Sequence, residues 1–523
     1  MPISVETALR RGLLARRRIS GFDMSGQSGR TTSGNDGLDA ILRGGLVANR
    51  LYLLEGSPGS GKTTLALQFL LDGVSRGEPC LYVTLSETEE ELHGVAASHG
   101  WSLDGVSIFE LATAEEALGA DRQQSILHPW ESELGGTIKL IKDVVQKIRP
   151  KRVVFDSLSE MRLLAQDPLR YRRQVLALKQ FFAPLDVTVI IVDDLTGEED
   201  GQRDAHLHSL CHGVITLERL TLDFGAARRR LEVQKMRGIE FVGGFHDFVI
   251  RRGGLDVFPR LIASQHHEPF LGESVASGLP ELDEMLGGGP LRGTSTLLTG
   301  PAGAGKSTIG LQYVFAACER GENCTIYEFD ERIGTMLARS RAMGLDLSGH
   351  IDAGRLVIEQ IDPAEISPGE FASHVRREVE TRGSRMVMID SLNGYVAAMP
   401  QEQHLILQTH ELLSYLNQRG VTTLLINPQS GLVGTMATSI NVSYIADAVL
   451  LIRFFEAGGR IRKALSILKN RSGPHEDAIR ELRIDSGGVR IGEPLTAFRG
   501  VLTGTPEYVG SHGPLMEDRG SGA

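Results

Sequence analysis

Two stretches of the chain have the residue types and the spacing of a loop that binds phosphate. Each consists of a glycine, four variable residues, and then Gly-Lys followed by Ser or Thr. In such a loop, backbone N–H groups surround phosphate oxygens at a helix N-terminus, the lysine reaches the β- and γ-phosphates, and the hydroxyl ligates Mg²⁺. One match in 523 residues could arise by chance, but two matches in the same flanking context predict two nucleoside triphosphate sites. The residues expected to bind nucleotide are Gly56, Ser57, Pro58, Gly59, Ser60, Gly61, Lys62, Thr63 and Thr64 in the first stretch, and Gly300, Pro301, Ala302, Gly303, Ala304, Gly305, Lys306, Ser307 and Thr308 in the second.

An aspartate follows a hydrophobic run in each half of the chain. Asp156 ends the run in RVVFDSL, and Asp390 ends the run in MVMIDSL. A phosphate-loop protein needs a carboxylate at such a strand end to hold Mg²⁺, directly or through water. A strand-capping aspartate is the alternative for an isolated case, but the recurrence favours metal. We therefore expect Mg²⁺ to be held by Thr63 with Asp156, and by Ser307 with Asp390.

Hydrolysis also needs a group that orients or deprotonates water. Carboxylates follow the next predicted strand in each half, as Glu87 after Ser86, and as Asp330 with Glu331. A carboxylate at this strand end can reach the side of the γ-phosphate, so these three acidic residues are the candidate catalytic groups. The glutamates at positions 89–91 are interpreted as the solvated start of a helix.

A Lys-x-Arg motif occurs late in each half. It comprises Lys235 and Arg237 in the first half and Lys469 and Arg471 in the second. Positive charges directed at the γ-phosphate would stabilise the charge of the transferring group. The alternative is an exposed charged strand edge, and the motif alone does not distinguish the two.

The positions of these motifs reveal an internal repeat. Lys62 and Lys306 lie 244 positions apart (306 − 62), whereas Asp156 and Asp390 lie 234 apart (390 − 156). One net deletion of ten residues between the markers accounts for both spacings. The chain is therefore predicted to contain a basic disordered arm (1–32), a first domain (33–262), a second domain (263–495) and a C-terminal tail (496–523).

Each repeat has an α/β pattern. Short continuous apolar runs such as 51–55, 187–192 and 385–389 alternate with amphipathic stretches such as 136–148 and 368–381. Such runs indicate a mainly parallel central sheet that helices cover on both faces. Ligands of such a sheet lie beyond the carboxyl ends of its strands, where both glycine-rich loops are expected.

Composition restricts the partners and the compartment. A formal net charge of −11 argues against broad electrostatic binding to nucleic acid. The four cysteines have no Cys-x-x-Cys spacing, which predicts buried thiols in a reducing cytosol. No apolar run approaches the ~20 residues that a membrane span needs. The sequence therefore predicts a cytoplasmic protein with no membrane partner, and its charge disfavours a nucleic acid partner.

The motifs resemble the KaiC family of RecA-like ATPases. The resemblance rests on GLDAILRGGL, GSPGSGKTTLALQFL and KMRG in the first repeat, and on GPAGAGKST, IDSL and KNRSGPHEDAIRELRI in the second, and it covers about residues 33–495. It implies two tandem RecA-like P-loop domains, stacked as two rings in a homohexamer with ATP and Mg²⁺ at subunit interfaces. In that arrangement Lys235, Arg237, Lys469 and Arg471 would reach the nucleotide of a neighbouring subunit.

The sequence departs from the family pattern at two places. The family has adjacent glutamates after the second strand, the first being the presumed base, but this chain has Ser86-Glu87 and Asp330-Glu331. The family's autophosphorylated Ser-Thr pair aligns with Ser443 and Tyr444, so only the serine is retained. Ser443 is thus the candidate phosphosite, with Thr438 and Ser439 as alternatives and an ordinary loop hydroxyl as the other interpretation.

The sequence therefore predicts an ATPase that hydrolyses ATP, is a candidate serine/threonine autokinase, and acts with signalling partners in a signalling or clock-type role. A RecA/DnaB-like nucleic-acid-dependent ATPase is one alternative, but the stretches after Asp156 and Asp390 supply no convincing basic loop. A non-catalytic hexameric scaffold, in which nucleotide only holds the ring together, is the other.

Overall fold

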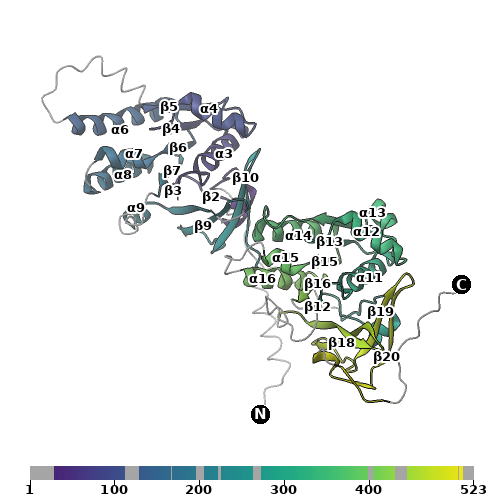
Figure 1. The fold of residues 1–523 in the computed structure, drawn as a ribbon. Coiled ribbons are helices and arrows are strands. Elements are labelled where there is room, and N and C mark those ends of the chain that lie inside the picture. The colour runs from purple at the N-terminus through teal and green to yellow at the C-terminus, as the bar shows by residue number, and fades with distance from the viewer. Residues whose placement is uncertain are drawn as a thin grey trace, which may run out of the picture. The chain divides into compact units, whose positions relative to one another are not determined.

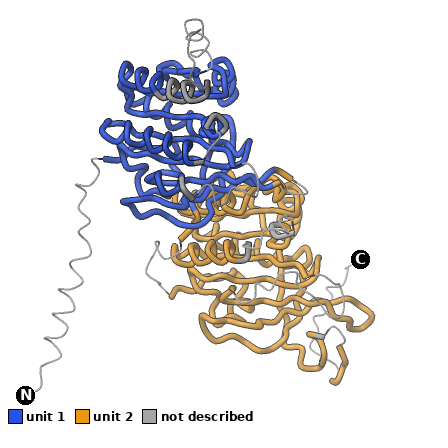
Figure 2. The backbone as a smooth tube through the Cα atoms, turned by 90° about the vertical axis from the view of Figure 1, so that its left-hand side faces the viewer, with its two compact units in different colours: residues 1–220, 227–259 blue, residues 221–226, 260–523 orange. Residues whose placement is uncertain are grey.

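The computed structural model describes residues 29–111, 129–165, 168–195, 205–221, 225–262, 272–397, 405–429, 445–503 and 506–510. The chain divides into two compact units (Figure 2). The first comprises residues 1–220 and 227–259, and the second comprises residues 221–226 and 260–523. Each unit is built around its own nine-stranded sheet (Figure 1).

The sheet of the first unit has the strand order β11-β10-β9-β8-β3-β7-β6-β4-β5. The five pairings from β8 to β5 are parallel, and the three from β11 to β8 are antiparallel. Its strands are β3 (Leu51–Gly56), β4 (Cys80–Thr84), β5 (Val106–Glu110), β6 (Arg152–Asp156), β7 (Thr188–Asp194), β8 (Gly213–Leu220), β9 (Arg228–Met236), β10 (Phe245–Arg251) and β11 (Gly254–Phe258). The helices are α2 (Asp36–Ile41), α3 (Lys62–Ser75), α4 (Glu89–Ser98), α6 (Pro129–Ile148), α7 (Leu158–Ala165), α8 (Pro168–Phe182) and α9 (Ala205–Leu210).

The second unit repeats this arrangement, with the order β20-β19-β18-β17-β12-β16-β15-β13-β14 and the same five parallel and three antiparallel pairings. Its strands are β12 (Ser295–Pro301), β13 (Cys324–Glu328), β14 (Leu356–Gln360), β15 (Met386–Asp390), β16 (Thr422–Gln429), β17 (Ala448–Ala457), β18 (Arg460–Asn470), β19 (Arg480–Asp485) and β20 (Gly488–Pro494). The helices are α10 (Pro280–Met285), α11 (Lys306–Glu319), α12 (Ile333–Ala342), α13 (Ser348–Asp352), α14 (Pro368–Arg382), α15 (Leu392–Ala397) and α16 (Leu405–Gln418). The predicted duplication and the predicted mainly parallel α/β fold are confirmed.

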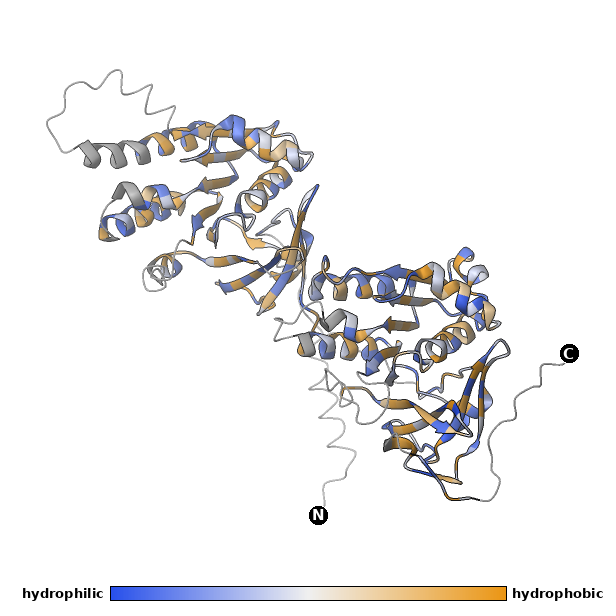
Figure 3. Cartoon of the chain, viewed as in Figure 1, coloured by the Kyte–Doolittle hydropathy of each residue, from blue (hydrophilic) through white to orange (hydrophobic). Residues whose placement is uncertain are grey.

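The central strands are apolar throughout because both faces of each sheet are covered. In the first unit, Leu51 and Leu53 of β3 pack in one core with residues of α6, α7 and α8. Leu298 of β12 packs with residues of α11, whereas its neighbour Leu297 packs on the other face with α14 and α16. Figure 1 shows α6, α7 and α8 on one side of the first sheet and α3 on the other, and it shows α11 on the opposite side of the second sheet from α14 and α16. Figure 3 shows the hydrophobic residues gathered in the strands.

Parts of the predicted arm and tail carry regular structure. In the arm, β1 (Arg30–Thr31) pairs with β2 (Leu46–Val47). In the tail, β21 (Phe498–Arg499) pairs with β22 (Glu507–Tyr508), flanking the short helix η4 (Val501–Thr503). Every helix in the described part of the chain is too short or too polar to cross a lipid bilayer.

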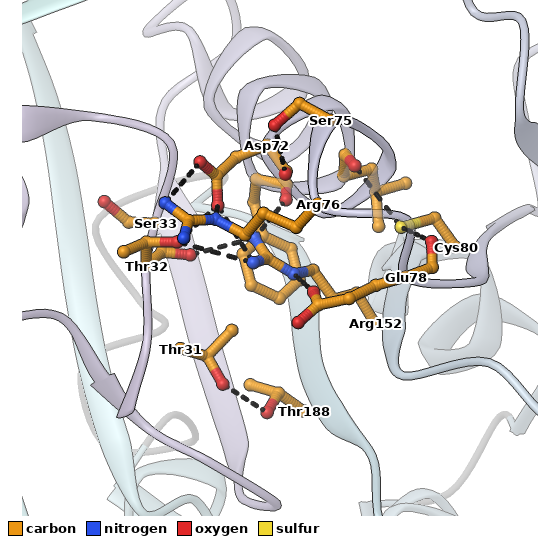
Figure 4. Close-up of polar contacts among 12 residues, drawn as sticks. Thr31, Thr32, Ser33, Asp72, Ser75, Arg76, Glu78, Cys80, Arg152 and Thr188 are labelled. Carbon is orange, nitrogen blue, oxygen red and sulfur yellow. Dashed lines mark hydrogen bonds and ion pairs between the residues drawn. The ribbon is translucent and has the colours of Figure 1, made fainter. Parts of the chain in front are cut away.

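A buried arginine distinguishes the core of the first unit (Figure 4). Arg152, the first residue of β6, is 1% exposed. Its guanidinium pairs with Asp72 (Nη2 to Oδ2, 2.9 Å) and with Glu78 (Nε to Oε2, 2.5 Å). It also donates hydrogen bonds to the backbone oxygens of Thr32 (2.9 Å) and Phe69 (2.7 Å). The charge is therefore compensated inside the core, as a buried cation requires.

The second unit fills the same position with an apolar side chain. Met386, the first residue of β15, holds the register position of Arg152 and is fully buried. The offset of 244 residues (316 − 72) places Ala316 where the first unit has Asp72. One unit thus builds this core position from an ion pair and the other from methionine and alanine.

Candidate functional site

Both glycine-rich loops join a central strand to the helix that follows it, as predicted. Gly61 and Gly305 precede α3 and α11 with φ of 106° and 108°, a left-handed conformation that favours glycine. No side chain caps either helix, so the first-turn N–H groups are available to an anion. The two loops share the backbone conformation of a phosphate-binding site.

The lysine of the first loop is surrounded by acceptors. Lys62 is 7% exposed, and its Nζ donates to the backbone oxygens of Gly56 (2.9 Å) and Ser57 (3.0 Å). It also pairs with Asp194 Oδ1 at 2.7 Å. The sequence prediction missed Asp194, although two consecutive aspartates ending an apolar run were a visible signal.

The predicted metal residues of the first unit meet. Thr63 Oγ1 donates to Asp156 Oδ2 at 3.4 Å, and the hydroxyl of Tyr82 donates to the same oxygen at 2.5 Å. Burial raises the pKa of Asp156, while the hydrogen bond from Tyr82 opposes that shift. The strand end therefore presents a hydroxyl and a buried carboxylate to the same point beside the loop.

Glu87, the candidate catalytic base of the first unit, lies just after β4. Its backbone N–H donates to Thr84 Oγ1 at 2.9 Å, which holds the turn. Among the described residues, its buried Oε2 atom has no hydrogen-bond partner. Burial, followed by the charge of Asp156, raises the pKa of Glu87 to about 7. Such a carboxyl group exchanges protons near neutral pH, which suits a general base.

In the part of the chain that the structure describes, the lysine of the second loop has fewer hydrogen-bond acceptors around it than the lysine of the first loop. Lys306 Nζ donates to the Pro301 oxygen at 2.8 Å, its one hydrogen bond within the described residues. Burial lowers the pKa of Lys306 to about 8, and the charge of Asp390 opposes this effect. Burial also raises the pKa of Asp390 to about 6, against a hydrogen bond from Ser307. Ser307 and Asp390 therefore meet as Thr63 and Asp156 do.

The two acidic candidates of the second unit have different partners. Asp330 accepts a short hydrogen bond from the hydroxyl of Ser391, the residue after Asp390. Glu331 forms an ion pair with Arg339 of α12, Oε2 to Nη2 at 2.6 Å. Both carboxylates are thus engaged within their own unit.

The sequence prediction also missed Glu328, the last residue of β13. Its Oε1 atom accepts the backbone N–H groups of Asp330 (3.2 Å) and Glu331 (2.8 Å). Burial, followed by the charge of Asp390, raises the pKa of Glu328 to about 8. It fills the role that Thr84 has in the first unit, and its charge within an apolar run was the signal that could have identified it.

The Lys-x-Arg motifs lie away from the loops of their own units. Lys235 pairs with Val214, which pairs in turn with Leu53 in the amino-terminal half of β3. It donates to the backbone oxygen of Cys211 at 3.0 Å, and also to that of His208. In the second unit Lys469 pairs with Val449, which pairs with Leu297 of β12, and Lys469 donates to Ala446 at 2.5 Å.

The arginines follow the lysines at the same sheet end. Arg237 Nη2 donates to the Ser209 oxygen at 3.3 Å, and the backbone N–H of Arg471 donates to the Asp447 oxygen at 2.9 Å. Each loop begins at the carboxyl end of its strand, so the structure does not bring either motif to its own loop. Ser443, the candidate phosphosite, lies outside the described residues.

The donor sets fit a Mg²⁺ ion that is shared with phosphates. Mg²⁺ in nucleotide sites takes one or two protein ligands and completes its shell with phosphate and water oxygens. Within the described ranges, no group of three or more His, Cys, Asp or Glu residues could form a metal cage of its own. A hydroxyl paired with one carboxylate in each unit matches the first type of site.

Comparison with known proteins agrees with this geometry. The family model "ATPase: KaiC" matches residues 31–262 and again residues 275–496. The chain is 26% identical over 487 residues to the circadian clock oscillator protein KaiC of Parathermosynechococcus lividus, covering 91% of this chain and 88% of that protein. It is 27% identical to the circadian clock protein KaiC3 of Synechocystis sp., covering 91% and 94%, and 28% identical to KaiC2 of the same organism, covering 90% and 83%. The chain belongs to the KaiC family of ATPases, with two tandem KaiC domains.

Proposed function

We propose that this chain binds and hydrolyses ATP at both loops, with Mg²⁺ held by Thr63 and Asp156 in one unit and by Ser307 and Asp390 in the other. The observation that carries the proposal is the recurrence of one arrangement, in which the hydroxyl after each loop lysine meets a buried strand-end carboxylate. Bound Mg²⁺ neutralises charge on the β- and γ-phosphate oxygens. Lys62 and Lys306 bind the same phosphates from the loop side.

The two sites are expected to hydrolyse ATP at different rates. Glu87 is the proposed base of the first site, and its buried Oε2 atom has no partner among the described residues. In the second site, Glu331 has to leave Arg339 before it can orient water, and Asp330 is held by Ser391. Serine at position 86 leaves the first site with one carboxylate where the second has two.

We further propose a ring-shaped homo-oligomer, a hexamer by resemblance to the family, in which Lys235, Arg237, Lys469 and Arg471 act on the nucleotide of a neighbouring subunit. The strand register supports this, because each motif lies at the opposite end of its sheet from its own loop. A motif that does not reach the nucleotide site of its own unit can contact the site of a neighbouring subunit in a ring.

A signalling or clock-type role, with partner proteins and autophosphorylation on Ser443, completes the proposal. Its support is the resemblance of the second repeat and the names of the relatives, which describe circadian clock proteins.

Incubation of the full chain with γ-labelled ATP and Mg²⁺ tests both activities at once. Lys62→Ala and Lys306→Ala should each remove one site's share of phosphate release, and the double variant should lose on the order of 100-fold. Lys147→Ala, which changes an exposed lysine on α6, is the matched control and should leave release unchanged. Label mapped to Ser443 supports the autokinase.

Two results would overturn parts of the proposal. Steady phosphate release without label on the segment around Ser443 removes the kinase and keeps the ATPase. Unchanged release by Lys306→Ala, together with a dispersed oligomer, means that nucleotide at the second loop only holds the assembly together.

A further inference from the structure

The ammonium group of Lys62 has no hydrogen left for a phosphate. A lysine ammonium carries three N–H donors. In the first unit these meet three acceptors, the Gly56 oxygen at 2.9 Å, the Ser57 oxygen at 3.0 Å and Asp194 Oδ1 at 2.7 Å. Two of the acceptors belong to the loop, so the carboxylate of Asp194 is the partner that a phosphate has to displace.

Asp194 is placed by a network at the tip of β7. Its backbone N–H donates to Ser159 Oγ (3.2 Å) and to Asp193 Oδ1 (3.1 Å). Asp193 is buried and forms an ion pair with Arg162 at 2.5 Å. The backbone of Asp194 is therefore held at the strand end, while its side chain is one-third exposed.

The charge of Asp194 faces the catalytic side of the site. β7 lies between β3, which carries the loop, and β6, which carries Asp156. After the larger effect of burial, Asp194 contributes to the raised pKa of Asp156 and of Glu87. An added γ-phosphate would bring further negative charge into this same region.

The second unit lacks this carboxylate. Asp194 pairs with Gly56, the first glycine of its loop, and the residue that pairs with the equivalent Gly300 is Pro428. The lysine of that loop donates to Pro301 alone among the described residues. The two units therefore share a phosphate loop and differ in whether a fixed anion competes for its lysine.

We propose that Asp194 is a specificity-determining residue that makes the first site less selective for nucleoside triphosphate over nucleoside diphosphate than the second site. The carboxylate competes with the γ-phosphate for Lys62 and repels it. A diphosphate lacks that extra anionic group and is disfavoured less. This inference rests on the proposed nucleotide binding at the first loop.

The test is competition of unlabelled ATP and ADP against a fluorescent ADP analogue, with Mg²⁺ present. The protein is the full chain carrying Lys306→Ala, which confines binding to the first loop. Adding Asp194→Asn keeps the shape and removes the charge, and it should raise the preference for ATP over ADP about tenfold. Asp186→Asn removes an exposed charge that pairs with Lys151 near the other end of β7, and it should leave the preference unchanged.

The reciprocal change uses the second loop. In a chain carrying Lys62→Ala, Pro428→Asp should lower the preference for ATP by a comparable factor. Thermal unfolding of each variant shows whether it is folded, and a ratio of two affinities in one protein does not change with the folded fraction.

The outcomes separate the inference from the function on which it rests. A chain with Lys306→Ala that binds neither nucleotide overturns binding at the first loop, and the inference with it. A chain that binds both nucleotides, with the same preference after Asp194→Asn, overturns the inference and leaves the function standing. A change that affects ATP and ADP equally assigns Asp194 a purely structural role and also overturns the inference.

Discussion

At the scale of single residues, the two sites differ in how their acidic groups are held. Glu87 has a buried carboxylate oxygen without a partner among the described residues and a pKa raised to about 7. Asp330 and Glu331 are bound to Ser391 and Arg339. The turn after β4 thus provides a carboxyl group that titrates near neutral pH. The equivalent turn after β13 provides two carboxylates that are bound to other side chains.

Phosphate release by the first unit should therefore rise with pH. Glu87 has to be ionised to accept a proton from water, so a pKa of about 7 leaves it mostly protonated at pH 6 and mostly ionised at pH 8. In a chain carrying Lys306→Ala, the rate should increase about tenfold over this interval and then level off. Steady-state release measured across the pH range checks this.

Two variants test whether Glu87 causes this rise in rate, one at Glu87 itself and one as a control. Glu87→Gln should abolish the rise, whereas Glu90→Gln, which changes an exposed residue of α4, should preserve it. A rise that persists in Glu87→Gln would assign the base to another group.

At the scale of elements, the helix after each loop packs on the sheet through different chemistry. In the first unit Asp72 of α3 compensates Arg152 of β6, and Gly73 leaves room for it, since a Cβ at Gly73 would lie 2.6 Å from Arg152 Cδ. The equivalent residues of α11 and β15 are Ala316, Ala317 and Met386. The same helix–strand contact is thus ionic in one unit and apolar in the other.

Replacing the arginine alone should be costly. Arg152→Met leaves the carboxylates of Asp72 and Glu78 without their buried cation, and breaking one half of a buried pair costs about 3–5 kcal/mol of unfolding free energy. The triple change Arg152→Met, Asp72→Ala and Gly73→Ala copies the second unit at these three positions. It should recover part of that loss, because Asp72 is gone whereas Glu78 stays without its cation. Denaturant unfolding of the full chain measures the loss and the recovery. The free energy of unfolding is read from the transition that shifts in Arg152→Met.

A triple variant that is no more stable than Arg152→Met would contradict this account. Arg76 pairs with Asp72 at 3.0 Å in the unmodified chain, and Arg152→Met leaves Arg76 in place, so a loss at the lower end of this range is expected.

At the scale of the whole molecule, the position of the Lys-x-Arg motifs is the main constraint on function. Both motifs sit at the amino-terminal side of the strand that carries the loop, where their lysines donate to backbone oxygens of their own unit. The register keeps each motif away from the loop of its own unit, and in the proposed ring a second copy of the chain supplies the catalytic contribution.

Complementation between two inactive chains checks this arrangement. One chain carries Lys62→Ala and the other Arg237→Ala, and both carry Lys306→Ala to silence the second loop. Each chain alone should be inactive. Rings assembled from equal amounts should recover about a quarter of the activity of the chain carrying only Lys306→Ala. An active interface needs Lys62 from one subunit and Arg237 from its neighbour, and about half of the subunits supply each. Mixed rings that form and stay inactive would contradict action between subunits.

Local patterns in the chain were sufficient to predict the duplication, the α/β class, both loops and the strand-end carboxylates. Each of these features depends on residues that are close together in sequence. Each loop lies between a strand and the helix that directly follows it, and each strand-end aspartate is the residue directly after an apolar run. The meeting of Thr63 with Asp156 also followed, since the carboxyl ends of parallel strands lie at one edge of a sheet.

Other features depend on which strands are neighbours, and strand order is a property of the folded sheet. Asp194 reaches Lys62 because β7 pairs with β3 in the register that opposes Asp194 to Gly56. In the sequence, Glu328 looks like an interior residue of a strand. Only the folded turn after β13 brings the backbone N–H groups of Asp330 and Glu331 to its carboxylate. The Lys-x-Arg motifs are separated from their own loops because an antiparallel hairpin returns the chain to the opposite end of the sheet.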